Sequence, residues 1–351
     1  MNLFERISND GYEQIVFCHD KDVGLKAIIA IHDSTLGPGT GGCRMYPYAT
    51  EDQALEDVLR LSRGMTYKAS ISGLKLGGAK AVIIGDPKKD KTPELLKRFG
   101  QYVETLKGRY ITAKDVGING DDLALVRRET NHVLGIEGVA GSSGDPSPLT
   151  AWGTYNGMKA CAAHVWGTSS LKGKRIAVQG LGYVSFSLIG YLVKEGASVV
   201  GADVDPQAVA RAQKEYGIDI VAPNEILAQD CDIVSPNALG AILNNLSIRE
   251  LKCKVVAGAA NNQLATDEDG AELMRRGIVY APDYAINAGG LMNIYHELDG
   301  YNAERAYDHV GGIYKTIEDI LVRAKKENQP TQRIADRMAE ERIQNAKKKR
   351  S

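Results

Sequence analysis

The fold of this chain is decided by the stretch RIAVQGLGYVS, residues Arg175–Ser185. Its first half is typical of a buried strand, and its second half is a G-x-G-x-x-S turn that opens a helix. In such a turn Gly180 permits the tight bend, and Gly182 lets a pyrophosphate approach the backbone. The N–H groups at the start of the helix then face the phosphates. The stretch therefore predicts a dinucleotide-binding α/β unit, with a purely structural glycine turn as the alternative.

A carboxylate further along the chain supports this interpretation. Asp203 follows the next strand-like run, residues 198–202, and stands 21 residues after Gly182. That offset suits a carboxylate that accepts a hydrogen bond from a ribose 2′-hydroxyl. Because a carboxylate there also repels a 2′-phosphate, Asp203 favours NAD over NADP. The expected cofactor-binding residues of this unit are Gly180, Gly182, Tyr183, Val184 and Asp203.

Strand-like and helical segments alternate through most of the sequence, which predicts α/β architecture. Further strands are expected at residues 24–31, 80–84, 109–112, 231–234, 254–258 and 277–280. A capping box at Thr50–Gln53 and a Thr92–Pro93 pair predict two helix starts early in the chain. The densest cluster of glycine, serine and proline, residues 141–148, predicts a break between two domains, followed by a helix over residues 152–164.

Composition bounds the class of protein. The chain has 351 residues, of which 43% are apolar and 25% charged, which is enough for two globular domains. Its net charge of −1 provides no basic field for nucleic acid or an anionic membrane. Five scattered cysteines without a C-x-x-C pair, and six histidines without metal-ligand spacing, predict a reducing compartment and no metal site. With no signal peptide and no apolar run of ~20 residues, we expect a cytoplasmic protein.

A second informative segment is RGMTYKASISGLKLGGAKAVII, residues Arg63–Ile84, which contains two lysines, Lys68 and Lys80, in apolar surroundings. Burial of an ammonium without a partner is costly. Two lysines in one cavity would disfavour each other's charge, and a neutral amine can act as a base. We interpret Gly77–Ala79 as a turn before a strand at Lys80–Ile84. The alternative is a pair of surface lysines beside a tight turn.

Seven blocks of sequence carry a resemblance to a known family. They are Gly37-Pro38 with Gly41–Met45, Arg63–Lys68, Gly77–Lys80, Thr112–Gly117, Pro148–Ala151, Gly258–Gln263, and Pro282–Tyr284 with Asn287–Gly290. On these blocks the chain resembles, over essentially its whole length, the amino acid dehydrogenases of the glutamate/leucine/phenylalanine/valine family, nearest the leucine and phenylalanine branch.

The resemblance implies a two-domain α/β fold with a deep cleft between the domains. The N-terminal catalytic and oligomerisation domain would comprise residues 1–145 and a C-terminal helix at about 331–351. The Rossmann NAD-binding domain would comprise residues 146–330. Relatives imply a homo-oligomer, an octamer or a dimer.

The resemblance also implies NAD-dependent oxidative deamination of an L-amino acid, with a role for each site residue. Lys68 would bind the substrate carboxylate. Lys80 would activate the water that attacks the iminium, and Asp115 would move protons to and from the amine. For Asp115 the alternative is a loop carboxylate that caps a turn. Thr150 matches the family residue that bonds the nicotinamide carboxamide, and its alternative role is a helix N-cap. Asn262 matches a family residue that lies near the ribose and the substrate, and its alternative role is a hydrogen bond within its loop.

The class of substrate follows from the same comparison. The glutamate branch has a lysine at the position of Thr40, and without a cation a buried γ-carboxylate would cost several kcal/mol. Among hydrophobic substrates, Ala113 favours the branched-chain type and Leu291 the phenylalanine type. We therefore expect a leucine-like, branched-chain substrate, with phenylalanine or tryptophan as the alternative. The expected substrate-binding set is Thr40, Gly41, Gly42, Lys68, Ala113, Leu291 and Ile294.

Three positions depart from the family pattern. Ala79 replaces the glycine before Lys80, which would strain the backbone if φ were positive there. Asn237 replaces a common cysteine, and Tyr183–Ser185 replaces the usual Asn/His-Val-Gly/Ala, which would alter cofactor affinity. A catalytically silent homologue that binds amino acid or nucleotide is the alternative from another class. A 2-hydroxy acid dehydrogenase is disfavoured, because the catalytic histidine and arginine pattern is missing.

Overall fold

The computed structural model describes residues 3–136, 138–139 and 141–350. These residues form two compact α/β units, each with its own sheet and its own buried core. The first unit comprises the residues up to Asp145, Ile294–Tyr301 and the residues from Ala339 onward. The second unit comprises Pro146–Asn293 and Asn302–Met338. The predicted fold class, two α/β domains, is confirmed.

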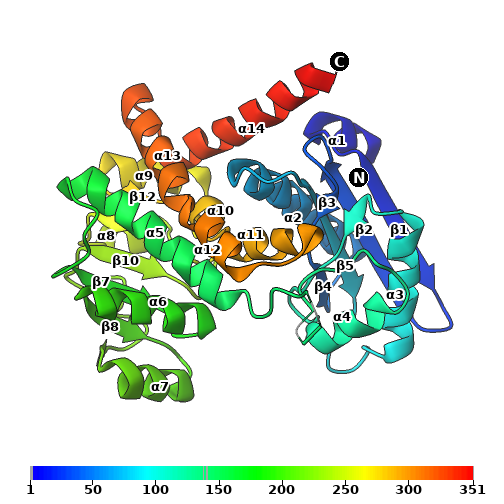
Figure 1. Cartoon of the computed structure of the whole chain (residues 1–351), viewed down its shortest axis with the longest axis horizontal. Helices are drawn as coiled ribbons and strands as arrows, with labels where there is room; N and C mark the ends of the chain where they lie inside the picture. The colour runs from blue at the N-terminus through cyan, green and yellow to red at the C-terminus, as the bar shows by residue number, and fades with distance from the viewer. Residues whose placement is uncertain (1–2, 137, 140, 351) are drawn as a thin grey trace. The chain divides into compact units, whose positions relative to one another are not determined.

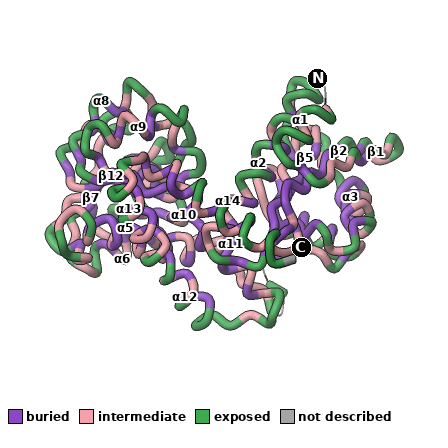
Figure 2. The backbone as a smooth tube through the Cα atoms, turned by 90° about the horizontal axis from the view of Figure 1, so that it is seen from above, coloured by how far each residue is buried: buried purple, intermediate pink, exposed green. Residues whose placement is uncertain are grey.

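The first unit is built on a mixed six-stranded sheet (Figure 1). Its strands are β1 (Gln14–Asp20), β2 (Leu25–Asp33), β3 (Gly39–Thr40), β4 (Cys43–Tyr46), β5 (Gly77–Ile84) and β6 (Tyr110–Ile111). β1 and β2 are antiparallel, as are β2 and β5, whereas β3 and β4 pair with β5 in parallel. β5 is therefore the central strand, and it is buried along nearly all of its length (Figure 2).

Helices cover both faces of this sheet. They are α1 (Leu3–Asp10), α2 (Glu51–Ile71), α3 (Pro93–Thr105) and α4 (Gly120–Arg127). The apolar side of α2 joins β2 and β5 in one buried cluster, whereas α3 and α4 contribute to a second cluster on the opposite face. Both predicted helix starts are confirmed, because the Thr50 and Thr92 hydroxyls each accept a backbone N–H at 3.2 Å. The central strand is thus enclosed between two layers of helices.

The start of β5 differs from the sequence-based interpretation. Gly77–Ala79 is not a turn, because β5 begins at Gly77 and Gly78 pairs with Asp33 in the neighbouring strand. A Cβ on Gly78 would stand 2.0 Å from the Thr66 backbone nitrogen of α2. Gly78 is required because α2 packs directly on the strand, and a Cβ on Gly77 would stand 2.3 Å from the carbonyl oxygen of Asp33. These tertiary constraints leave the same sequence signal as a turn.

The second unit has a fully parallel six-stranded sheet of order β12-β11-β10-β7-β8-β9. Its strands are β7 (Arg175–Gln179), β8 (Ser198–Ala202), β9 (Asp219–Ile220), β10 (Ile233–Pro236), β11 (Val255–Val256) and β12 (Val279–Tyr280). The order of strands reverses at β7, which has β8 on one side and β10 on the other. Open parallel sheets bind ligands at the carboxyl ends of the strands beside such a switch point.

The remaining helices follow these strands or close the chain. They are α5 (Ser147–Trp166), α6 (Tyr183–Glu195), α7 (Pro206–Tyr216), α8 (Ser247–Glu250), α9 (Asp267–Arg275), α10 (Asp283–Ile286), α11 (Gly289–Tyr295), α12 (Ala303–Gly311), α13 (Ile313–Glu327) and α14 (Thr331–Arg350). The predicted strand–turn–helix unit is confirmed, since β7 leads through Gly180–Gly182 into α6. α8 and α9 contribute to the core on one face of the sheet, and α5 packs on α6 and α13.

α5 begins earlier than the predicted residue 152, at Ser147. Pro148, part of the predicted break, lies in the first helical turn, where the missing N–H of proline has no helical partner to lose. Two glycines allow α5 to pack closely on its neighbours. A Cβ on Gly153 or Gly157 would stand within 2.5 Å of side-chain carbons of Ile313 and Ile286.

The C-terminal helix α14 is divided between the units, whereas the sequence analysis assigned residues 331–351 to the first domain. Near the start of α14, Arg333 pairs with Asp267 of the second unit at 2.6 Å. Further along, Arg342 donates to the backbone carbonyl of Ser70 in the first unit at 2.8 Å. The division follows from these polar contacts, which the sequence does not reveal.

Two further features bear on the kind of protein. The five cysteines Cys18, Cys43, Cys161, Cys231 and Cys253 are buried free thiols. Burial raises the pKa of Cys18 and Cys253 to about 11, so these thiols stay protonated at neutral pH. Across the described ranges, no helix is long and apolar enough to cross a membrane.

Candidate active site

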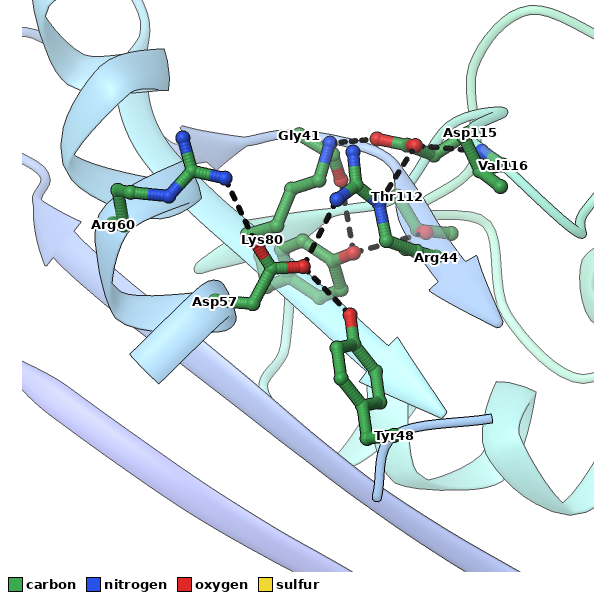
Figure 3. Close-up of polar contacts among 10 residues, drawn as sticks. Gly41, Arg44, Tyr48, Asp57, Arg60, Lys80, Thr112, Asp115 and Val116 are labelled. Atoms are coloured by element: carbon green, nitrogen blue, oxygen red, sulfur yellow. Dashed lines mark hydrogen bonds and ion pairs between the residues drawn. The ribbon is translucent and has the colours of Figure 1, made fainter. Parts of the chain in front are cut away.

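An ion pair between Lys80 and Asp115 lies at the centre of a polar network in the first unit (Figure 3). The Lys80 ammonium contacts Asp115 Oδ2, and Lys80 is only 5% exposed. The other oxygen, Oδ1, accepts from Arg44 Nε at 3.2 Å and from Val116 N at 2.6 Å. A buried amine next to a buried carboxylate provides the two groups that acid–base chemistry requires.

Strand alternation sets the direction of the Lys80 side chain. Ala79 and Ala81 belong to the core cluster that β5 shares with α3. Val82 belongs to the cluster that β5 shares with α2. Because successive side chains of a strand point to opposite faces, Lys80 points to the α2 side of the sheet.

The backbone fixes Asp115 relative to the same strand. Asp115 lies in the loop after β6, and two hydrogen bonds tie this loop to β4. Cys43 N donates to Ala113 O and Met45 N donates to Val116 O, both at 2.9 Å. Since β4 also pairs with β5, the loop and the strand of the lysine share one neighbour. The ion pair is therefore held by main-chain pairing rather than by its side chains alone.

The glycines around the pair are needed for close approach. A Cβ on Gly41 would stand 1.8 Å from the carbonyl oxygen of Ala79. A Cβ on Gly42 would stand 2.3 Å from the carbonyl oxygen of Lys114. Any side chain at either position would push the strand and the loop apart and separate the ion pair. Contact of these two glycines with a substrate stays a prediction.

Lys68, the expected carboxylate binder, lies near the end of α2 and is half-buried. It follows Met65 by one turn, and Met65 Cγ lies 3.2 Å from the position of a Cβ on Gly41. Residues three apart on a helix share a face. Lys68 therefore lies on the side of α2 that faces the Gly41 segment. That Lys68 and Lys80 share one cavity stays a prediction.

The predicted pocket residues are distributed over both units. Thr40 is 1% exposed in β3, and its hydroxyl donates to a carbonyl of its own segment at 3.3 Å. Ala113 is buried in the loop that contains Asp115. Ile294 belongs to the first unit, where its Cγ2 lies 3.5 Å from the position of a Cβ on Gly135. Leu291 is buried in the second unit, so a pocket that joins all four stays a prediction.

The charges around Asp115 lower its pKa. Burial alone would raise the pKa of this carboxyl, but attraction to Lys80 and Arg44 outweighs burial, so the pKa lies below its usual value. Burial and the nearby Asp115 charge raise the pKa of Cys43 well above its usual value. At neutral pH the carboxyl is therefore ionised and the neighbouring thiol is neutral.

Sequence reasoning missed two charged residues of this network. Arg44 of β4 bonds Asp115 through Nε and also pairs with Asp57 of α2 through Nη1 at 2.9 Å. Asp57 accepts in addition from Tyr48 OH at 2.7 Å and from Arg60 Nη2 at 2.9 Å. Arg44 lies within one of the family blocks, but no local pattern indicates that its partner is on the following helix.

Ala79, which replaces the glycine that the family usually has before Lys80, is accommodated without backbone strain. It is fully buried in β5, where it pairs with Ile31. Its φ is not positive, so the condition for strain is not met. Its methyl group joins the core cluster shared with α3. The alanine therefore adds buried apolar surface without backbone strain.

The glycine turn of the second unit has the geometry of a phosphate-binding loop. Gly180 has a φ of +85°, and a Cβ there would stand 2.8 Å from Cβ of Ala238. Gly182 is the N-cap of α6, and no atom lies within 4 Å of the position of its Cβ. The start of α6 has no side-chain cap. The open side of Gly182 and the uncapped helix start both fit a bound pyrophosphate.

Asp203 supports this turn from the end of β8. Its Oδ2 accepts from Leu181 N at 2.5 Å, and its Oδ1 accepts from Asp205 N at 2.9 Å. Each carboxylate oxygen has a second lone pair, so Asp203 retains capacity for a ribose hydroxyl. Ser185 is 1% exposed, and its hydroxyl has no hydrogen-bond partner among the described residues. That unpaired hydroxyl is the cost of a serine where the motif has glycine or alanine.

Asn237 directly follows β10, and Asn262 lies in the loop after β11. The Asn237 side-chain amide donates to Ser235 O at 3.0 Å and accepts from Ala259 N at 2.7 Å. Asn237, which replaces the cysteine common in the family, therefore links the segments that follow β10 and β11, beside the switch point. Asn262 is exposed, has a φ of +51°, and its carbonyl accepts from Ala241 N at 2.7 Å. Its proposed contact with ribose stays a prediction.

Thr150 lies in the first turn of α5. Its hydroxyl donates to the carbonyl of Pro146 at 2.9 Å, and Pro146 rather than Thr150 is the N-cap. A Cβ on Gly290 would stand 3.0 Å from Thr150 Oγ1. The starts of α5 and α11 therefore meet at Thr150, while its bond to nicotinamide stays a prediction.

An aromatic and cationic stack adjoins the glycine turn. Tyr183 is 71% exposed, and the Arg211 guanidinium lies 5.1 Å from its ring centre and 4.5 Å from that of Phe186. Arg211 Nη2 also donates to Leu181 O at 3.1 Å. Leu181 is thus held through its N–H by Asp203 and through its carbonyl by Arg211. Among the described residues, no group of three or more His, Cys, Asp or Glu could hold a metal ion.

Comparison with known proteins gives consistent matches along the chain. Residues 12–132 match the family described as "Glu/Leu/Phe/Val dehydrogenase, dimerisation domain", and residues 205–351 match "Glutamate/Leucine/Phenylalanine/Valine dehydrogenase". The chain is 53% identical over 351 residues to the leucine dehydrogenase of Bacillus subtilis (strain 168), covering 100% of the chain and 96% of the relative. It is 46% identical over 344 residues to the phenylalanine dehydrogenase of Thermoactinomyces intermedius, covering 97% and 94%. The crystal structure of L-tryptophan dehydrogenase from Nostoc punctiforme matches with a TM-score of 0.88 and 44% identity, covering 99% of both chains.

Proposed function

The chain belongs to the glutamate/leucine/phenylalanine/valine dehydrogenase family, and on that premise we propose that it catalyses the NAD-dependent oxidative deamination of L-leucine and related branched-chain amino acids. The products are the 2-oxo acid, ammonia and NADH, and the reverse reaction is reductive amination. The buried Lys80–Asp115 pair carries the proposal. A silent homologue would gain little from such a pair, because burial of two charges is costly.

The residues of the first unit supply the binding and the proton transfers. NAD, when bound, accepts a hydride from the substrate Cα, which leaves an iminium on the substrate. Lys68 holds the substrate carboxylate as a charge-assisted pair. Lys80 takes a proton from the water that attacks the iminium, and Asp115 Oδ2, which contacts the Lys80 ammonium, is positioned to receive that proton. Asp115 then returns it to the amine nitrogen, and the Lys80 amine, neutral again, takes the proton of the carbinolamine hydroxyl as the carbinolamine collapses to 2-oxo acid and ammonia.

The residues of the second unit fit NAD. The open side of Gly182 and the uncapped start of α6 would receive the pyrophosphate. Asp203 would accept from the adenosine ribose, and its negative charge disfavours the 2′-phosphate of NADP. Thr150 and Asn262 would contact the nicotinamide end. Use of a nicotinamide dinucleotide follows from membership of the family alone.

Leucine is preferred over the other substrates of the family for two reasons. Thr40 is neutral and its hydroxyl is bonded within its own segment, which gives the γ-carboxylate of glutamate no cation there. The identity to the Bacillus subtilis leucine dehydrogenase, 53%, exceeds the 46% to the phenylalanine dehydrogenase. An aromatic amino acid is the second candidate, because Leu291 is of the phenylalanine type. A homo-oligomer, an octamer or a dimer, is part of the proposal, since residues 12–132 match a dimerisation domain.

A substrate panel tests this function. NADH formation with NAD should give the highest kcat/KM for L-leucine, followed by valine and isoleucine, with phenylalanine and tryptophan lower. A difference of one methylene in such a pocket corresponds to about 10–200-fold. A preference for phenylalanine or tryptophan would replace leucine by the aromatic candidate. A protein that binds NAD and turns over none of the five would overturn the enzymatic proposal.

A further inference from the structure

Arg44 is a charged residue of the site that the reaction described above does not use. We propose that Arg44, held in place by Asp57, is a positioning residue that occupies Asp115 Oδ1 and leaves Oδ2 as the atom that exchanges protons with Lys80. The inference rests on the proposed function, because it assigns the proton-transfer atom of the same site.

The two oxygens of Asp115 have different surroundings. Oδ1 accepts from Arg44 Nε at 3.2 Å and from Val116 N at 2.6 Å, so both of its lone pairs are engaged. Oδ2 contacts the Lys80 ammonium. A proton that arrives at the carboxylate would have to displace a donor from Oδ1, whereas at Oδ2 it comes from the contacting amine itself. The geometry therefore assigns Oδ1 to the fixed hydrogen bonds and Oδ2 to proton exchange with Lys80.

Arg44 is suited to an anchoring role and unsuited to a relay. Its guanidinium keeps its proton at any ordinary pH, so it cannot pass a proton onward. It acts through its position and its charge. Asp57 takes the other edge of the guanidinium at 2.9 Å and is itself fixed by Tyr48 OH at 2.7 Å. The planar fork of arginine is what allows one side chain to bridge two carboxylates.

The charges alternate in sign from α2 to β5. Asp57, Arg44, Asp115 and Lys80 follow one another, with side-chain exposures of 16%, 24%, 14% and 7%. Charges so far removed from water interact more strongly than surface charges. The positive charge of Arg44 therefore stabilises the ionised form of Asp115, and the negative charge of Asp57 partly offsets that effect.

The other titratable neighbours are few and identifiable. Asp115 faces Lys80 from β5, Arg44 and Cys43 from β4, and the buried Tyr110 of β6, whose pKa is raised by burial and by the Asp115 charge. Cys43 is also influenced by Asp122 of α4. Asp122 is itself paired with Lys91 at 2.6 Å, and burial keeps the Cys43 thiol neutral. Changes in the pH profile on substitution of Arg44 or Asp57 thus report on the Lys80–Asp115 pair.

A merely structural role for Arg44 makes a different prediction. If Arg44 only joined β4 to α2, removal of either Arg44 or Asp57 would lower stability without moving the pH profile. In the positioning role the two removals act in opposite directions. Arg44→Gln removes a positive charge, so the pair holds its proton more tightly and the acid limb of kcat/KM moves to higher pH. Asp57→Asn removes the negative charge that partly compensates Arg44. The pair then holds its proton less tightly, so the acid limb of kcat/KM moves to lower pH.

The test is the pH profile of kcat/KM for L-leucine in the wild-type protein and four variants. We expect Arg44→Gln to move the acid limb up by about one pH unit, and so to lower kcat/KM about ten-fold at a pH below the limb. Asp57→Asn should move it down by a smaller amount. Arg44→Lys keeps the charge and loses the fork, so the limb should stay in place while kcat falls.

Arg60→Gln is the matched control. Arg60 also pairs with Asp57, but its side chain is 52% exposed and it does not contact Asp115. Its profile should coincide with that of the wild type. NAD affinity, measured by titration, should be the same in all five proteins, because none of these residues belongs to the nucleotide turn.

The outcomes separate the two proposals. Shifts of Arg44→Gln and Asp57→Asn in the same direction, or no shift in either, would overturn the positioning role. If circular dichroism shows that Arg44→Gln does not fold, Asp57→Asn decides, and a stationary acid limb in that variant would overturn the role. A wild-type protein without turnover of any substrate in the panel would overturn the proposed function before any variant is compared.

Discussion

The glycines beside Lys80 and the glycines of the turn at residues 180–182 look alike in the sequence, but they satisfy different requirements. A Cβ on Gly41, Gly42 or Gly78 would meet a backbone atom at 1.8, 2.3 or 2.0 Å. A Cβ on Gly182 would meet nothing within 4 Å. In the first unit glycine lets protein approach protein, whereas in the second it leaves space for something that is not protein.

This difference separates a closed region from an open one. Around Lys80, each charge of the network already has a protein partner, and main-chain pairing fixes the distances. Around Gly182, the helix start has no side-chain cap, and Asp203 retains acceptor capacity. Substitutions in the closed region should therefore affect both stability and chemistry, whereas substitutions in the open region should affect ligand binding alone.

The largest effect is expected for Lys80→Ala. Loss of the base should lower kcat for L-leucine about 10²–10⁴-fold, while NAD affinity stays unchanged. Lys75→Ala is the matched control, because Lys75 is exposed on the same segment. Steady-state kinetics and NAD titration check both parts. A loss of less than about ten-fold in kcat would contradict the assigned role.

Gly78→Ala should show that the closed region is closed by packing. The added methyl group would collide with the Thr66 backbone, so the free energy of unfolding should fall by about 1–3 kcal/mol. Gly64→Ala, on the exposed side of α2 with nothing within 4 Å, should be neutral or slightly stabilising. Urea unfolding measures both. Equal effects of the two substitutions would rule out the packing explanation.

Gly182→Ala should have the opposite signature. Its φ of −65° suits alanine and the surrounding space is open, so the free energy of unfolding should stay within about 0.5 kcal/mol of the wild type. The methyl group should nevertheless obstruct the pyrophosphate and raise KM for NAD about ten-fold. If stability fell as much as in Gly78→Ala, the turn would be structural rather than a cofactor site.

Ala79→Gly should have the smallest effect, although it restores the residue that the family usually has. Because Ala79 lies in a strand without positive φ, glycine adds chain entropy and removes a buried methyl group. The free energy of unfolding should fall by about 0.5–1 kcal/mol with kcat unchanged. A marked rise in kcat would mean that the Ala79 methyl group displaces the neighbouring lysine after all.

Local signals account for what the sequence could predict. The Rossmann half is recognisable because a strand, a tight turn and a helix start follow one another along the chain, and β7, α6 and β8 lie where that pattern indicates. The helix starts at Thr50 and Thr92 are likewise local, since each cap bonds a residue three positions later. Such contacts leave a signature within a few residues.

Tertiary contacts account for what the sequence could not predict. Gly77–Ala79 was interpreted as a turn because glycine is disfavoured in strands, yet close packing of α2 is what requires glycine at position 78. Asp57 lies among apolar helix positions, and its pairing with Arg44 depends on how α2 lies on the sheet. The division of α14 between the units depends in the same way on partners far away in the sequence.

The central claim is that the Lys80 amine acts as the base of an amino acid dehydrogenase. It is tested most directly by addition of a small primary amine, methylamine, to the Lys80→Ala variant with L-leucine and NAD. The account predicts that NADH formation, nearly absent at the start, rises with the concentration of the free amine and saturates, while methylamine leaves the wild type unaffected. Near-normal turnover by Lys80→Ala without added amine would contradict the account.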